Sequence, residues 1–122
     1  MKHTQHLSEP NFFKIIAVFW TALIFYLSLD NSPNVPNISF ENKDKIVHFL
    51  FYFFFVMFWF KGLQLQNFNF CLLLFFIAVS TGIIIEFLQK YFTANRSFDG
   101  YDILANTFGA VTGLLIVLKK IK

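Results

Sequence analysis

The stretch FCLLLFFIAVSTGIIIEFL, residues 70–88, contains a single charged residue, Glu86. A helix needs about 20 predominantly apolar residues to cross a bilayer, because the hydrocarbon core is about 30 Å thick and a helix rises about 1.5 Å per residue. This stretch therefore predicts a transmembrane helix.

Three more stretches of the chain have a similar length and apolar character. A bilayer disfavours charge, since one charged side chain at a helix centre costs roughly 2.5–3.5 kcal/mol on insertion scales. Of the 17 Lys, Arg, Asp and Glu residues, only Lys14, Glu86 and Asp102 lie within the four apolar runs. We predict spans over residues 12–29, 44–60, 70–88 and 101–118, with Asp44 and Lys45 in the first turn of the second.

The overall composition excludes several classes of soluble protein. The 122 residues are 57% hydrophobic and 14% charged, with 20 Phe, whereas a soluble domain has roughly 45–50% apolar and about 25% charged residues. The single Cys71 excludes an internal disulfide, and no Cys/His spacing resembles a zinc site. The net charge of +3 is spread along the chain, so we expect no nucleic-acid partner.

These features predict an all-α integral membrane protein with one domain, residues 1–122. The fold is an up-down-up-down bundle of four transmembrane helices. A signal peptide is the competing interpretation of the first stretch, but the run is too long and no small-x-small cleavage site follows it before Asp30.

The positive-inside rule gives the orientation of the bundle. With the N-terminus in the cytoplasm, the inner side has six Lys residues and the outer side has four Lys or Arg residues. Both termini are thus predicted to be cytoplasmic, with the first and third loops outside. The inner set is Lys2, Lys14, Lys61, Lys119, Lys120 and Lys122, and the outer set is Lys43, Lys45, Lys90 and Arg96.

Polar residues gather in three segments that this topology brings to the outer membrane boundary. Helical spacing places Lys45, His48 and Tyr52 on one stripe, Glu86 and Gln89 on one face, and Asp102 and Asn106 on another. The candidate ligand-binding residues are Asp44, Lys45, His48, Tyr52, Glu86, Gln89, Arg96, Ser97, Asp99, Asp102 and Asn106.

Structural roles compete with binding for several of these residues. Asp44 and either Asp99 or Asp102 are good helix N-caps. The long side chain of Lys45 could extend to the lipid headgroups. Tyr52 is a residue type typical of the aromatic belt at the membrane interface.

Glu86 is harder to explain by a structural role. A carboxylate near a helix C-terminus opposes the helix dipole, and the surrounding residues are apolar. Arg96 and His48 are the nearest partners by topology. The sequence leaves open a buried ion pair that holds the outer loop down and a polar cavity lined by His48, Glu86, Arg96 and Asp102.

The fourth stretch also contains a small-xxx-small pattern, Gly109 to Gly113. Small residues let helices approach closely. We expect a tight crossing within the chain rather than a homodimer contact.

The polar segments resemble the VanZ-like family of small bacterial membrane proteins. The resemblance covers roughly residues 44–113, and its last block is the most specific. Thr93-Ala94-Asn95 departs from the family, which often has a Pro-Gly turn before the Arg. The matching residues are Asp44-Lys45-x-x-His48-Phe49-x-x-Tyr52, then Glu86-x-x-Gln89, then Arg96-Ser97-x-Asp99-x-x-Asp102-Ile103-x-x-Asn106-x-x-Gly109-x-x-x-Gly113.

This resemblance implies a protein of the bacterial cell envelope. The founding member is associated with resistance to the glycopeptide teicoplanin, and no reaction is settled for the family. A phosphotransbutyrylase label sometimes given to the family has no basis in this chain, which has no phosphate-cradling Gly-rich loop.

Binding of an anionic lipid headgroup or a lipid-linked cell-wall intermediate is our leading hypothesis, with membrane lipids as partners. Arg96, Lys45 and His48 can contact phosphate. We expect no cofactor and no resident metal.

One alternative is an intramembrane enzyme acting on a polyprenyl-phosphate headgroup. In this enzyme His48 pairs with Glu86 or Asp102, and Asp, Glu and His could hold a metal. Another is a structural subunit whose polar residues only hold the bundle together.

Overall fold

The computed structural model of the chain describes residues 9–29, 41–92 and 100–121, with the backbone alone described at residues 41–44 and 92. These residues form four α-helices and no strand. The helices are α1 (Glu9–Leu29), α2 (Glu41–Leu63), α3 (Phe68–Phe92) and α4 (Gly100–Lys120).

The four predicted spans are confirmed as helices long and apolar enough to cross a membrane. Each helix extends beyond its predicted span, α2 by three residues at either end and α3 by two at its start and four at its end. A helix can continue past the hydrocarbon boundary because its backbone hydrogen bonds are internal, whereas hydropathy marks only the apolar part.

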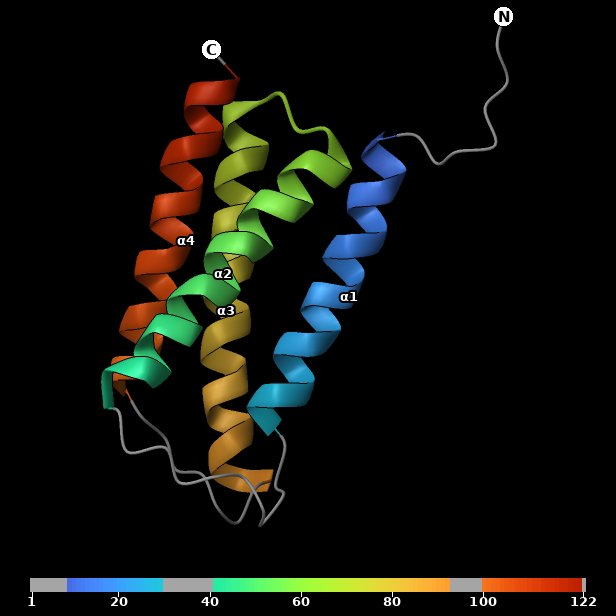
Figure 1. Ribbon diagram of the computed structural model, residues 1–122. Helices are drawn as coiled ribbons and strands as arrows, with labels where there is room; N and C mark the ends of the chain where they lie inside the picture. Colours follow the sequence, from blue (N-terminus) through green and yellow to red (C-terminus); the bar gives the residue numbers. More distant parts are fainter. Residues whose placement is uncertain (1–8, 30–40, 93–99, 122) are drawn as a thin grey trace, which may run out of the picture.

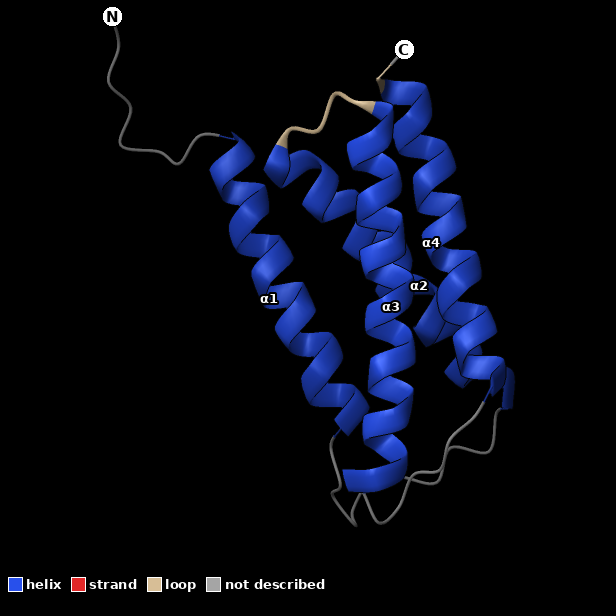
Figure 2. Ribbon diagram, turned by 180° about the vertical axis from the view of Figure 1, so that it is seen from behind, coloured by secondary structure: helices blue, strands red, loops and turns tan. Residues whose placement is uncertain are grey.

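Consecutive helices alternate in direction along the bundle. Figure 1 shows the start of α1 and the end of α4 at one end, and the end of α1, the starts of α2 and α4 and the end of α3 at the other. Helix α2 runs diagonally across the bundle and packs most extensively on α4 and then on α1. Seen from behind, the described residues are helical except for the short connection from α2 to α3 and Ile121 after α4 (Figure 2).

The surface of the bundle is apolar. Phe19 and Tyr101 are each 72% exposed, and Phe108 is 62% exposed. In the most apolar 18-residue segment of each helix, at most 39% of the residues are buried. A soluble domain rarely exposes apolar surface on this scale, so the outward face fits contact with lipid.

Two glycines allow α4 to lie directly on α2. A Cβ at Gly109 would meet the backbone carbonyl of Phe49, and a Cβ at Gly113 would lie 3.0 Å from Cβ of Val56. The small-xxx-small pattern therefore lies at a helix crossing within the chain.

Tryptophans link α1 to α2. Nε1 of Trp20 donates to the carbonyl of Phe51 at 2.7 Å, and Nε1 of Trp59 donates to Oγ1 of Thr21 at 3.0 Å. A buried indole N–H needs an acceptor, and these bonds fix the contact at two levels of the bundle.

Candidate functional site

The site lies at the end of the bundle where α2 and α4 begin and α3 ends. We call its members the polar cluster: Lys45, His48, Glu86, Asp102 and Asn106. The first two lie on α2, Glu86 on α3 and the last two on α4. Four of them are almost fully buried, with exposed fractions of 0% to 6%, although the helices around them are apolar. Buried polar groups in such surroundings need partners, and contacts within the cluster supply them to His48, Asp102 and Asn106.

Asp102 is the centre of the contacts within the polar cluster. Its Oδ1 lies 2.6 Å from Nζ of Lys45, and its Oδ2 lies 3.5 Å from Nε2 of His48. The side chain of Lys45 is 31% exposed, whereas that of Asp102 is 8% exposed. The pair therefore joins a buried carboxylate to a lysine whose side chain is partly exposed.

Asn106 fixes the ring of His48. Nδ1 of His48 lies 3.0 Å from Oδ1 of Asn106. An amide oxygen can only accept a hydrogen bond, so Nδ1 carries the hydrogen and donates. Nε2 then faces Asp102, one helical turn before Asn106 on the same face of α4.

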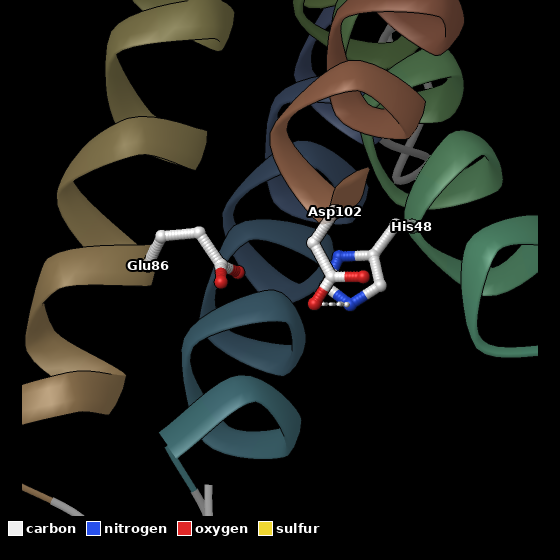
Figure 3. Close-up of side chains that lie close together, drawn as sticks. All are labelled: His48, Glu86 and Asp102. Atoms are coloured by element: carbon white, nitrogen blue, oxygen red, sulfur yellow. Dashed lines mark ion pairs between the residues drawn. The ribbon is translucent and has the colours of Figure 1, made fainter. Parts of the chain in front are cut away.

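Glu86 enters the polar cluster from α3. Its carboxylate points from that helix toward His48 and Asp102 (Figure 3). One ligand-type atom from each of these three residues lies within 4.8 Å of the others, and all three residues are buried. The structure thus brings Glu86 to His48, one of the two partners that topology suggested.

The predicted stripe on α2 extends one turn deeper to Tyr52. This residue is 1% exposed. Its interpretation as an interfacial belt residue is wrong, because a belt residue faces the lipid. Tyr52 instead lies in the buried core of the bundle, one helical turn after His48.

Gln89 connects α3 to α1. Its Nε2 donates to the backbone carbonyl of Ser28 at 2.7 Å, and both residues are buried. The carbonyls in the last turn of a helix have no partner within the helix, so this bond satisfies one of them. Gln89 therefore stabilises the end of α1 as well as sharing a face with Glu86.

Four predicted site residues are not placed. The side chain of Asp44, together with Arg96, Ser97 and Asp99, lies outside what the structure describes. Backbone positions still settle two caps. Asp44 is not the N-cap of α2, because that helix begins at Glu41, and Asp102 lies inside the first turn of α4 with its carboxylate on Lys45.

Two residues beside the site, Gly82 and Ser28, were not predicted from the sequence. A Cβ at Gly82 would lie 2.8 Å from Nδ2 of Asn106, so the glycine leaves the space that the amide occupies. Gly82 precedes Glu86 by four residues, and this spacing on one helix face was the available signal. Ser28 takes part through its backbone, which no side-chain pattern could reveal.

A cavity of about 330 Å³ lies at the opposite end of the bundle, where α1 begins and α2 ends. Glu9, Phe13, Phe60, Lys61 and Gln64 are among its lining residues. None of the predicted site residues lines it. The polar cluster is therefore a packed network in the described structure rather than the wall of this cavity.

The polar cluster has the chemistry to bind ions of either sign. Lys45 offers a partly exposed ammonium to an anion, while Glu86 and Asp102 offer carboxylates and His48 an imidazole to a cation. His48, Glu86 and Asp102 come from three different helices. A cation bound by all three would therefore also hold those helices together.

A model of the VanZ/LLP1 family matches residues 2–121 of the chain. The match covers nearly the whole chain, including all four helices and every residue of the polar cluster. No curated protein and no solved structure matches the chain.

Proposed function

The chain belongs to the VanZ/LLP1 family, and we propose that it is a multi-pass protein of the bacterial cell membrane that binds an anionic lipid headgroup or a lipid-linked cell-wall intermediate through its polar cluster. The polar end of the bundle would lie at the outer membrane boundary, with the first and third loops outside and both termini in the cytoplasm. The excess of Lys residues at the other end supports this orientation.

The ion pair between Lys45 and Asp102 carries this proposal. Nζ of Lys45 is held at 2.6 Å from a buried carboxylate, yet about a third of the side chain is exposed. An ammonium can bind more than one anionic group, because it has three hydrogens to donate. A lipid phosphate is the anion present in quantity at a membrane boundary.

The cost of the polar cluster in an apolar bundle also supports a binding role. Replacing a buried ion pair by apolar residues of similar volume is often neutral or stabilising. A network of His48, Glu86, Asp102 and Asn106 is therefore more than stability requires. Binding explains why ionisable groups stand where hydrophobic residues would pack.

The burial of the same network favours a second candidate function, a purely structural one. Four members of the polar cluster are at least 94% buried, and they link α2, α3 and α4. Under this reading the polar cluster holds three helices in register and binds nothing. Removal of any one partner would then destabilise the fold, by roughly 3–5 kcal/mol for a buried pair.

Native mass spectrometry of the purified full chain tests the proposal against this alternative. The protein is titrated in detergent with phosphatidylglycerol, with undecaprenyl phosphate and with zwitterionic phosphatidylcholine. We expect both anionic lipids to bind more tightly than phosphatidylcholine. The tighter of the two identifies the source of the phosphate, an ordinary phospholipid or a lipid-linked carrier.

A pair of matched variants locates the binding site. Lys45→Gln removes the ammonium of the polar cluster, and Lys90→Gln removes an exposed ammonium at the same end of the bundle. We expect about tenfold weaker binding of the anionic lipid for Lys45→Gln, since a charge-assisted hydrogen bond contributes roughly 1.5–3 kcal/mol. Equal losses in the two variants, or no preference for anionic lipid, would contradict the proposal.

An effect on antibiotic susceptibility follows if the bound lipid is a cell-wall intermediate. A protein that binds such an intermediate changes the access of teicoplanin to its membrane-bound target. Expression in a susceptible bacterium should then raise the inhibitory concentration of teicoplanin. Lys45→Gln, produced at the same protein level, should lose this effect.

A further inference from the structure

We propose that His48, Glu86 and Asp102 bind a divalent transition-metal ion, one ligand from each of α2, α3 and α4. This site does not depend on lipid binding, because its ligands are the buried members of the polar cluster rather than Lys45. The sequence-based expectation of no metal relied on the absence of a zinc-type spacing. Such a spacing cannot reveal ligands that lie far apart in the chain and meet only when the helices pack.

The distances suit a small cation. Zinc-type bonds to nitrogen or oxygen are about 2.0–2.2 Å long, so ligand atoms around the ion lie roughly 3.3–3.6 Å apart in tetrahedral geometry. Nε2 of His48 and Oδ2 of Asp102 are already 3.5 Å apart. All three ligand atoms lie within 4.8 Å of one another, so side-chain movements of about 1 Å bring them to these distances.

The outer contacts of the ligands have the pattern of a metal site. A ligating histidine usually donates its second ring N–H to an oxygen, which fixes the ring and directs the other nitrogen to the ion. Nδ1 of His48 donates to Oδ1 of Asn106 in this way, and Nε2 faces Asp102. Ligating carboxylates are likewise hydrogen-bonded, and Oδ1 of Asp102 accepts from Lys45 while Oδ2 faces the histidine.

The ligand set indicates the kind of ion. One imidazole and two carboxylates form a mixed nitrogen and oxygen site, which suits Zn²⁺ better than Mg²⁺ or Ca²⁺, which prefer oxygen ligands alone. Three protein ligands leave at least one position of a tetrahedral ion for another group. Burial of the ligands also favours a cation, because two carboxylates stand in an apolar bundle at 0% and 6% exposure.

The test measures metal binding by the full chain purified in detergent without added lipid. Chelator-treated protein is titrated with Zn²⁺, and bound metal is measured by mass spectrometry after removal of the free ion. Co²⁺ serves as a second probe, because its visible absorption reports a bound, low-symmetry ligand set. We expect about one equivalent of Zn²⁺ per chain and a Co²⁺ spectrum that Zn²⁺ abolishes.

Conservative variants show whether the three named side chains are the ligands. Glu86→Gln, Asp102→Asn and His48→Gln keep the approximate shape, and each should lower the Zn²⁺ affinity at least about tenfold, as should Asn106→Leu through the orientation of His48. Glu9→Gln is the matched control, since it removes an exposed carboxylate at the opposite end. Its affinity should equal that of the wild type.

Two results would overturn the metal site. One is the absence of stoichiometric Zn²⁺ in wild-type protein whose helicity and melting temperature are intact. The other is unchanged affinity in the Glu86→Gln and Asp102→Asn proteins. Neither result touches the lipid titration, because that experiment depends on Lys45.

Discussion

Nζ of Lys45, on α2, lies 2.6 Å from Oδ1 of Asp102, on α4, and joins the first part of one helix to the first turn of the other. The pair stands where the two most extensively packed helices of the bundle begin. It links the buried side chain of Asp102 to Lys45, whose side chain is 31% exposed.

A double-mutant cycle on this pair measures its coupling. Lys45→Met and Asp102→Asn should each lower the free energy of unfolding, by about 1–3 kcal/mol for a hydrogen bond to a charged group. The double variant should lose less unfolding free energy than the two single variants lose together, with a coupling energy of about 1 kcal/mol. The first substitution already breaks the ion pair, so the second has no such interaction left to remove. Chemical unfolding in mixed micelles gives the four values, and strictly additive losses would show that the two groups do not interact.

Close packing of α4 on α2 predicts a specific sensitivity at one glycine. Gly109→Ala places a methyl group against the carbonyl of Phe49, so the two backbones must separate. We expect a loss of about 1–3 kcal/mol in the free energy of unfolding, as for overpacking in a core, although alanine is the better helix former. The same variant should weaken the contact between His48 and Asn106, because these residues lie on the same two helices.

Gly100→Ala is the matched control for the packing prediction. A Cβ at Gly100 meets nothing within 4 Å. Its melting temperature should equal or exceed that of the wild type, since alanine has the higher helix propensity. Similar destabilisation by Gly100→Ala and Gly109→Ala would show that the α2–α4 approach is not the cause.

The proposed orientation is tested by labelling engineered cysteines in intact cells. In a Cys71→Ala background, Lys90→Cys and Gln66→Cys place thiols at exposed positions at opposite ends of the bundle. A membrane-impermeant maleimide should label the Lys90→Cys protein in intact cells and the Gln66→Cys protein only after permeabilisation. The reverse pattern would put the polar cluster at the cytoplasmic face.

The number of helices and the faces of the polar residues could be predicted from the sequence. A bilayer forces apolar runs of fixed length, so residues 70–88 predict a spanning helix without knowledge of its neighbours. Helical spacing likewise puts His48 and Tyr52 on one stripe, and both are buried together.

Partners across helices could not be predicted in the same way. Periodicity gives the face of a residue but neither the rotation of its helix in the bundle nor the depth of its neighbours. Gln89 therefore shared a predicted face with Glu86, while its bond to the carbonyl of Ser28 depends on how α1 packs. The sequence likewise left open whether Asp102 caps α4 or faces the other helices, and the structure places its carboxylate on Lys45 of α2.

The proximity of a lipid phosphate to Lys45 is the most direct measurement of the proposed function. Solid-state NMR of the protein in phosphatidylglycerol bilayers, with ¹⁵N in the lysine side chains, detects ¹⁵N–³¹P dipolar coupling between an ammonium and a phosphate in hydrogen-bond contact. The account predicts a coupled lysine signal that disappears in Lys45→Gln and persists in Lys90→Gln. A coupled signal that survives Lys45→Gln unchanged, or no coupled signal at all, would contradict it.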